Sequence, residues 1–104
     1  MPKYYYPPEW SAELTQRNNI VSVVSSYITL NRKGRQYWAC CPFHHEKTPS
    51  FTVNEEGQYY HCFGCGVGGN VVDFVMQMES CDRERAIEIL AQKAGMKMPE
   101  NMGD

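Results

Sequence analysis

The sequence predicts an α+β fold in which helices at both ends of the chain flank one small antiparallel sheet. Apolar residues recur every three or four positions in residues 9–28 and 83–95, as in amphipathic helices. Between them, short runs of aromatic and β-branched residues alternate with turn residues, as in a strand meander. The same central part holds two pairs of metal-binding residue types, each pair separated by two positions.

The first helical region follows residues 1–8, whose tyrosines and prolines predict an irregular lead-in. Asn18 and Asn19 interrupt the apolar spacing of residues 9–28, so we expect two short helices or one bent helix. Farther along, NRKG at 31–34 predicts a tight turn between strands ITL and QYWA. NEEG at 54–57 predicts a second turn, between strands PSFTV and QYYHC.

Two more helices are expected after GVGGN. Asn70 is expected to cap the first, VVDFVMQM, and Asp82 the second, which Gly95 ends. The second helix has an apolar stripe made of Ala86, Ile87, Leu90, Ala91 and Ala94. We expect one domain over residues 9–98, with 99–104 as a tail.

Composition narrows the class of protein. The chain has 104 residues, and its five cysteines are an odd number, which argues against a fully paired disulfide framework. No run approaches the ~18 apolar residues of a membrane span, and residues 1–10 do not resemble a secretory signal. We therefore expect a cytoplasmic protein without a membrane partner. The net charge is −2, but residues 31–53 carry four basic residues against one acidic residue, a local charge of +3.

The two pairs are Cys41-x-x-His44 and Cys62-x-x-Cys65. A gap of two residues lets both side chains of a pair turn toward one ion, and two such knuckles complete a tetrahedron. Three thiolates and one imidazole favour zinc, so we predict one structural Zn²⁺. Adjacent side chains of a strand point to opposite faces, so Cys40 and His61 should face away from the ion.

A catalytic interpretation competes with the structural one. His44 and Glu46, followed by Cys62-x-x-Cys65, match the H-x-E and C-x-x-C parts of the zinc deaminase signature. Cys41, however, offers a fourth ligand, which leaves no position for an activated water. We disfavour the deaminase, and also a redox role for Cys62-x-x-Cys65, because the metal needs these thiols. Cys81 lies outside the pairs and is interpreted as a small buried apolar residue.

Around the pairs, basic residues alternate with aromatic ones, as in proteins that bind single-stranded nucleic acid. The same residues also fit an ordinary solvated surface with an aromatic core beneath it. Composition alone only slightly favours nucleic-acid binding.

The stretch CPFHHEKTPSFTVNEEGQYYHCFGCGVGGNVVDFVM resembles the N-terminal zinc-binding domain of bacterial DNA primases. NNIVSVVSSYITL, RKGRQY and AIEILAQKAGM also resemble that family, so the likeness covers about residues 14–98. It implies a zinc ribbon with ligands Cys41, His44, Cys62 and Cys65, which helps to select initiation sites on single-stranded template DNA. The family's RNA polymerase domain, with its Mg²⁺ centre, and its contact with the replicative helicase lie in other parts of a full primase. The resemblance therefore implies no catalytic residue here, but part of a primer-synthesising nucleotidyltransferase at full length.

The resemblance also suggests residues that bind DNA. Arg35 and Lys47 are the first choices for phosphate contacts, followed by Arg32, Lys33, Tyr59 and His61, of which the last two would meet bases. The polymerase domain would act in the same chain or in a neighbouring one. Two alternatives remain: the corresponding domain of a phage or plasmid primase–helicase, and a stand-alone zinc protein that binds a protein partner.

Overall fold

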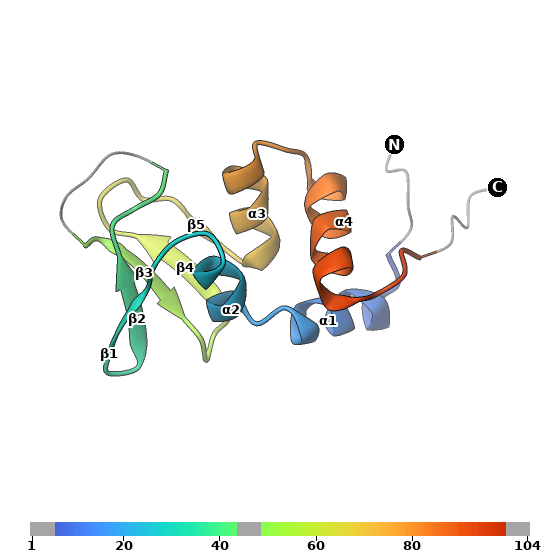
Figure 1. Cartoon of the computed structure of the whole chain (residues 1–104), viewed down its shortest axis with the longest axis horizontal. Coiled ribbons are helices and arrows are strands. Elements are labelled where there is room, and N and C mark those ends of the chain that lie inside the picture. The colour runs from blue at the N-terminus through green and yellow to red at the C-terminus, as the bar shows by residue number, and fades with distance from the viewer. Residues whose placement is uncertain (1–5, 44–48, 100–104) are drawn as a thin grey trace.

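The structure is a computed structural model, and it describes residues 6–43 and 49–99. Within these residues the chain forms two helices, five short strands and two more helices, in that order (Figure 1). The predicted α+β class, with helices on both sides of the sheet in sequence, is confirmed.

The first helical region is divided at the two asparagines, as one of the two expectations had it. Helix α1 covers Pro8–Arg17 and helix α2 covers Ile20–Ser25. The Asn18 backbone N–H donates to the carbonyls at the end of α1. The Asn19 side chain accepts a hydrogen bond of 2.9 Å from Val21 N and so begins α2.

The sheet is an antiparallel meander in which each strand pairs with its neighbours in sequence. Its strands are β1 (Asn31–Lys33), β2 (Gln36–Ala39), β3 (Phe51–Asn54), β4 (Tyr59–Cys62) and β5 (Gly68–Gly69). The hairpin predicted around NEEG is present between β3 and β4, where Phe51 is opposite Cys62 and Asn54 opposite Tyr59.

The position of the first turn was predicted wrongly. Residues 31–33 form β1 instead of the turn, Asn31 pairs with Trp38, and the chain reverses at Gly34, whose φ is +65°. Residues 28–30 do not form a strand, because Ile28 and Leu30 pack against the core instead. Strand β5 was not predicted, since two glycines carry no side-chain signal for a strand.

Helix α3 (Val71–Glu79) begins as predicted and ends one residue later than predicted, and helix α4 (Arg83–Ala94) begins and ends as predicted. The Asn70 side chain accepts from Asp73 N at 3.0 Å, and the Asp82 side chain accepts from Arg85 N at 2.8 Å. Gly95 follows α4 with φ +69°, a left-handed conformation that glycine adopts without strain.

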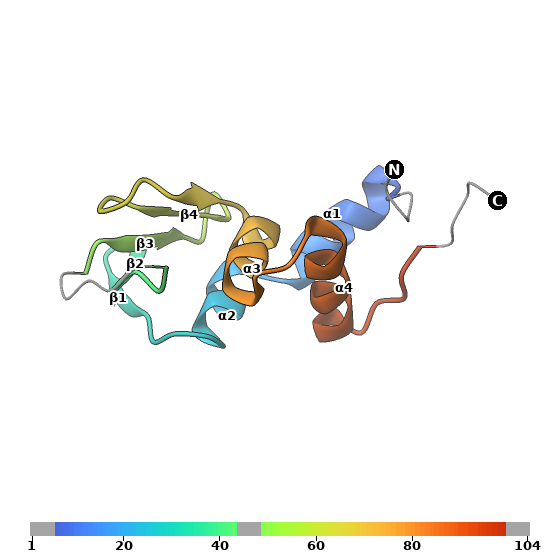
Figure 2. The same cartoon turned by 90° about the horizontal axis from the view of Figure 1, so that it is seen from above.

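The core lies between the helices and one face of the sheet, here called the inner face. Phe51 and Tyr60 point inward and contact Phe74 of α3, and all three rings are buried. Helix α2 adds Ile20 and Val24 to the same cluster. Residues that alternate with the inward ones point to the opposite, outer face. Figure 2 shows α2 and α3 beside the sheet, and α1 and α4 farther away.

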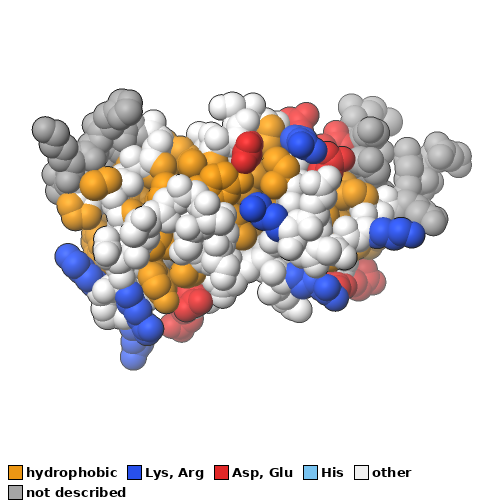
Figure 3. Space-filling model, in the orientation of Figure 1, with side chains coloured by type: hydrophobic (Ala, Val, Ile, Leu, Met, Phe, Trp, Pro, Cys, Tyr) orange, Lys and Arg blue, Asp and Glu red, His pale blue; other side chains and the backbone are white. Residues whose placement is uncertain are grey.

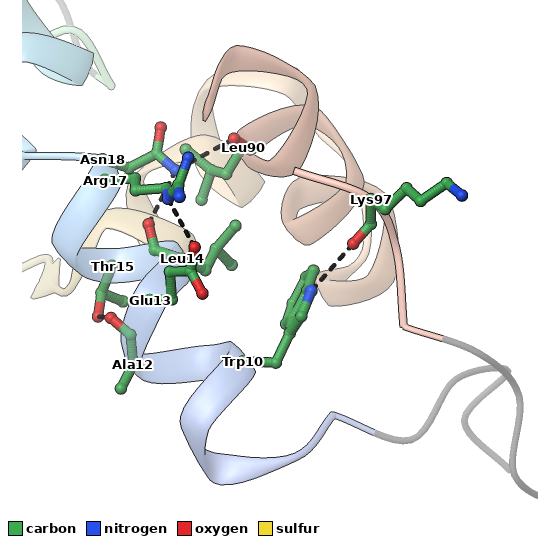
Figure 4. A network of polar contacts seen from close by, with 9 residues as sticks. All are labelled: Trp10, Ala12, Glu13, Leu14, Thr15, Arg17, Asn18, Leu90 and Lys97. Carbon is green, nitrogen blue, oxygen red and sulfur yellow. Dashed lines mark hydrogen bonds and ion pairs between the residues drawn. The ribbon is translucent and has the colours of Figure 1, made fainter. Parts of the chain in front are cut away.

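At the end of the molecule away from the sheet, two side chains of the α1 region bond to α4 and to the segment after it (Figure 4). The buried Asn18 amide donates to Leu14 O at 2.9 Å and to Leu90 O of α4 at 3.1 Å. The Trp10 indole donates to Lys97 O at 2.9 Å, beyond the end of α4. The molecule is elongated, with Cα extents of 49 × 24 × 18 Å, so these contacts lie far from the sheet.

Candidate metal centre and outer sheet face

Three of the four predicted ligands lie together at one end of the sheet. Cys41 follows β2, Cys62 ends β4, and Cys65 lies in the turn after β4. Their Sγ atoms are all within 4.8 Å of one another, and those of Cys41 and Cys65 are 3.9 Å apart. Zinc binds thiolate sulfur at about 2.3 Å, so two sulfurs of a tetrahedral site lie about 3.8 Å apart. The cluster therefore has the donor type and the spacing that zinc needs.

The backbone around Cys62 has the form of a metal knuckle. The N–H groups of Gly64 and Cys65 hydrogen-bond to the Cys62 sulfur. Gly66 N donates to Cys62 O at 2.8 Å, and its φ of +79° is strained for a residue with a Cβ. The Phe43 N–H bonds to the Cys41 sulfur in a similar way. Such amides stabilise thiolates, so both turns are formed to hold charged sulfur.

The two buried thiols differ in acidity. Burial dominates at Cys41 and raises its pKa to about 12 in the absence of a metal. Burial also acts to raise the pKa of Cys62, but hydrogen bonds from Ser50 and from the knuckle amides outweigh it and lower that pKa to about 7. A bound cation favours the thiolate at both positions.

The neighbouring residues face away from the cluster, as alternation predicts. Cys40 is exposed while Cys41 is buried, and His61 lies on the outer face while Cys62 lies on the inner one. Cys81 is half-buried between α3 and α4, and burial raises the pKa of its thiol. His44, the fourth predicted ligand, lies outside the described residues, as do His45, Glu46 and Lys47.

The described residues suggested to bind DNA lie along the whole sheet, with Lys33 and Tyr59 at its hairpin end and His61 next to Cys62 at its metal end. Lys33, Tyr59 and His61 belong to the outer face by strand alternation, and Arg35 is exposed in the β1–β2 turn. Arg32 differs, because it alternates to the inner side, where its guanidinium lies 5.9 Å from the centre of the Tyr37 ring.

The charge is mixed at the hairpin end of the sheet, which holds the β1–β2 and β3–β4 turns. Figure 3 shows Lys and Arg side chains gathered over the end of the sheet where β1 turns into β2, with acidic side chains beside them. Register places the β3–β4 turn, with Glu55 and Glu56, at the same end of the sheet. The metal cluster lies at the opposite end. An anionic chain that follows the outer face would therefore meet cations at the hairpin end only.

Sequence reasoning missed the most exposed aromatic side chain among the described residues, Phe63, which is 67 % exposed. Its ring stacks on Trp38, with centroids 6.2 Å apart and planes inclined by 23°. It also meets His61 edge-on, with centroids 4.7 Å apart. A signal was available, because a residue between two ligands of a knuckle has its backbone fixed and its side chain directed to solvent.

Among residues 6–43 and 49–99, none of the helices combines the length and the apolar character required to cross a membrane.

The meander and the cysteine cluster together define a zinc-binding domain of the zinc-ribbon class. Residues 6–104 match the family described as CHC2 zinc finger, and the chain belongs to this family. Its predicted likeness to the zinc-binding domain of bacterial DNA primases is confirmed by individual relatives.

Curated DNA primases share about half of the residues of this chain. The Pseudomonas putida DNA primase is 50% identical over 97 residues, which are 93% of this chain and 15% of that protein. The Pseudomonas aeruginosa DNA primase is 52% identical over 93 residues, 89% of this chain and 14% of that protein. The Escherichia coli K12 DNA primase is 44% identical over 91 residues, 88% of this chain and 16% of that protein. The chain thus spans only about one seventh of the length of these relatives.

A solved structure has the same fold. The crystal structure of the Aquifex aeolicus primase, comprising zinc-binding and RNA polymerase domains, matches with a TM-score of 0.80 and 41% identity. The match covers 84% of this chain and 22% of that one.

Proposed function

We propose that this chain is the template-recognition domain of a DNA primase, which binds single-stranded DNA and directs the start of RNA primer synthesis. The observation that carries the proposal is the outer face of the sheet. It presents the exposed Tyr59 and Lys33 at the hairpin end and His61 next to the metal cluster, in a chain about half identical to curated DNA primases. Cations that follow phosphates and aromatic faces that receive bases are the common features of single-strand binding.

One zinc ion would hold this face in place. The ligands would be Cys41, Cys62 and Cys65, with His44 as the fourth. When bound, zinc supplies folding free energy and no chemistry, because four protein ligands leave no open position for water. The deaminase signature needs only His44, Cys62 and Cys65, so the presence of the Cys41 sulfur in the cluster supports a closed structural site over a deaminase.

The remaining parts of the function belong to a longer protein. An RNA polymerase domain with its own Mg²⁺ would join the ribonucleotides, in the same chain or in a neighbouring one. A replicative helicase would contact another part of the protein, and the assembly would act in the cytoplasm. The chain itself supplies binding and positioning, so no residue in it is assigned a catalytic role.

Binding is tested with the zinc-loaded chain and a fluorescent single-stranded oligonucleotide, by anisotropy over a range of salt concentrations. Because counterions are released, the logarithm of affinity should fall linearly with the logarithm of salt, by ~0.7 for each phosphate contact. Arg35→Ala and Lys33→Ala should each weaken binding and reduce the slope by about 0.7. Arg83→Ala removes the same charge as Arg35→Ala from an exposed position on α4, and it should change neither quantity. Equal affinity for all variants at low salt would exclude this face as the binding surface.

Template recognition is tested separately by primer synthesis. A polymerase domain of a related primase is given single-stranded template and ribonucleotides, with and without the zinc-loaded chain. Addition of the chain should restore or redirect initiation, and its Lys47→Ala variant should do so less well. Unchanged primer yield and unchanged start sites would refute the role in initiation, even if DNA binding is observed.

A further inference from the structure

The aromatic residues beside the metal cluster form a built surface, which we call the Trp38–Phe63 shelf. It consists of Trp38, His61 and Phe63, with Thr52 beneath them. Trp38, Thr52 and His61 lie side by side across β2, β3 and β4 in the same register row. The Phe63 ring contacts the two outer members of this row, so it lies over the residue between them.

The burial of Thr52 shows that the shelf is closely packed. Thr52 points to the outer face, yet it is only 4% exposed. Its hydroxyl donates to His61 O at 2.9 Å, so the polar atom beneath the rings has a partner. The polar atom under the shelf is therefore satisfied, and Trp38 and Phe63 do not belong to the buried core cluster on the inner face of the sheet.

Phe63 is fixed in position by its backbone. Its N–H donates to Ser50 O at 2.9 Å, and in sequence it lies between Cys62 and Cys65, which both belong to the cysteine cluster. A large apolar ring that is held rigidly and is 67% exposed has the low conformational entropy cost that favours a binding contact.

We infer that the Trp38–Phe63 shelf is a stacking site for one unpaired nucleobase, with the base lying on the solvent-facing side of the Phe63 ring. This inference rests on the proposed function and specifies how the same sheet face takes its ligand. Every base has a flat π face, so stacking of this kind does not depend on sequence.

The ring spacing determines where the base lies. A flat base inserted between two rings needs about 7 Å, twice the carbon contact distance of about 3.5 Å. The Trp38 and Phe63 centroids are 6.2 Å apart, so the pair is already in contact and leaves no room between them. The base therefore stacks on the outside of the pair, and Trp38 supports Phe63 from behind.

The nearby charges favour a nucleic acid over an apolar protein segment as the occupant. Lys33 lies opposite Gln36 of β2. Gln36 and Trp38 are two positions apart on the same face of this strand, so they are separated by roughly 7 Å. Lys33 and Arg35 are exposed at that end. A base on the shelf would thus have its neighbouring phosphates within reach of two cations.

The test uses the zinc-loaded chain with Trp10→Phe, which leaves Trp38 as the reporting tryptophan, since the chain has two. Trp38 fluorescence should be quenched by single-stranded oligothymidylate. Phe63→Ala should weaken this binding by about 5- to 150-fold, the range measured for loss of one stacked base. An oligomer of the same length that has the sugar–phosphate backbone but no bases should bind equally well to the Phe63→Ala variant and to the chain that keeps Phe63.

Two matched variants separate stacking from simple apolar contact. Phe63→Tyr keeps the aromatic face and should retain binding, whereas Phe63→Leu keeps apolar bulk and should lose it. Zinc content is measured for each variant, so that loss of the fold is recognised. If Phe63→Ala or Phe63→Leu binds oligothymidylate as tightly as Phe63→Tyr, the stacking site is refuted while the proposed function stands. If no variant binds any single-stranded oligomer, both are refuted.

Discussion

Replacement of Cys41 by serine, compared with the same replacement at Cys40, tests how the two adjacent cysteines divide their roles. Cys41 Sγ is buried and lies 3.9 Å from Cys65 Sγ, whereas Cys40 is exposed. Serine differs from cysteine by one atom, so the two variants change the same chemistry at neighbouring positions. We expect Cys41→Ser to lose zinc and then the sheet, and Cys40→Ser to keep both.

The expected magnitude follows from the number of ligands. A structural zinc contributes an apparent ~10–16 kcal/mol to folding, and division among four ligands gives about 2.5–4 kcal/mol for each. Zinc affinity should therefore fall by roughly 10²- to 10³-fold in Cys41→Ser. A loss of about 2.5–4 kcal/mol is a large part of the ~5–15 kcal/mol that stabilises a typical domain. Cys40→Ser should remain within about 0.5 kcal/mol of the original chain.

Zinc is measured by competition with a chromogenic chelator, and the fold by circular dichroism and urea unfolding of the same samples. A chelator in excess should bring the original chain to the state of Cys41→Ser. Stoichiometric zinc of unchanged affinity in Cys41→Ser would refute its assignment as a ligand. Equal loss of zinc in both variants would refute the division between the two cysteines.

Three further results are expected. Tyr60→Phe should raise the free energy of unfolding by about 1 kcal/mol, because the buried Tyr60 hydroxyl has no hydrogen-bond partner among the described residues. A lower free energy of unfolding in urea would contradict this and indicate a partner elsewhere. Asn18→Ala should lower that free energy by roughly 1–3 kcal/mol, since Leu90 O loses a buried donor, and thermal unfolding without any change would contradict this. Burial and the hydrogen bond to Glu79 raise the pKa of Tyr27 from 10.0 to about 12, so its stabilising effect is complete below pH 10 and is lost as pH rises toward 12. Tyr27→Phe should flatten this alkaline decline in unfolding measurements made from pH 9 to 12, and an equally steep decline would exclude Tyr27 as its source.

Much of the fold was predictable because local chemistry and tertiary structure agree. Asn18 and Asn19 interrupt the helical spacing and do separate α1 from α2, since both asparagines bond to the backbone at the junction. Asn70 and Asp82 were recognised as caps from their type and place alone. These features need only residues within a few positions of one another.

The first hairpin was misplaced because its register depends on contacts distant in sequence. All three residues of β1 are exposed, so no alternation of apolar residues marks the strand. Its register is seen only in its pairing with β2, where Asn31 lies opposite Trp38. Sequence spacing predicted the cysteine pairs and the outward direction of Cys40 and His61. The burial of Thr52 on the outer face was not predictable, because it depends on residues from neighbouring strands that lie far apart in the sequence.

The hydrogen bond from Trp10 to Lys97 has a mechanical consequence. It joins the beginning of α1 to the segment after α4, so both ends of the described chain lie at the helical end of an elongated molecule (Figure 1). Any larger domain attached through either end would be joined to the helices of this domain, and the sheet would lie farthest from the attachment. A small rotation at the attachment would then carry the cysteine cluster, at the far end of the molecule, through a long arc.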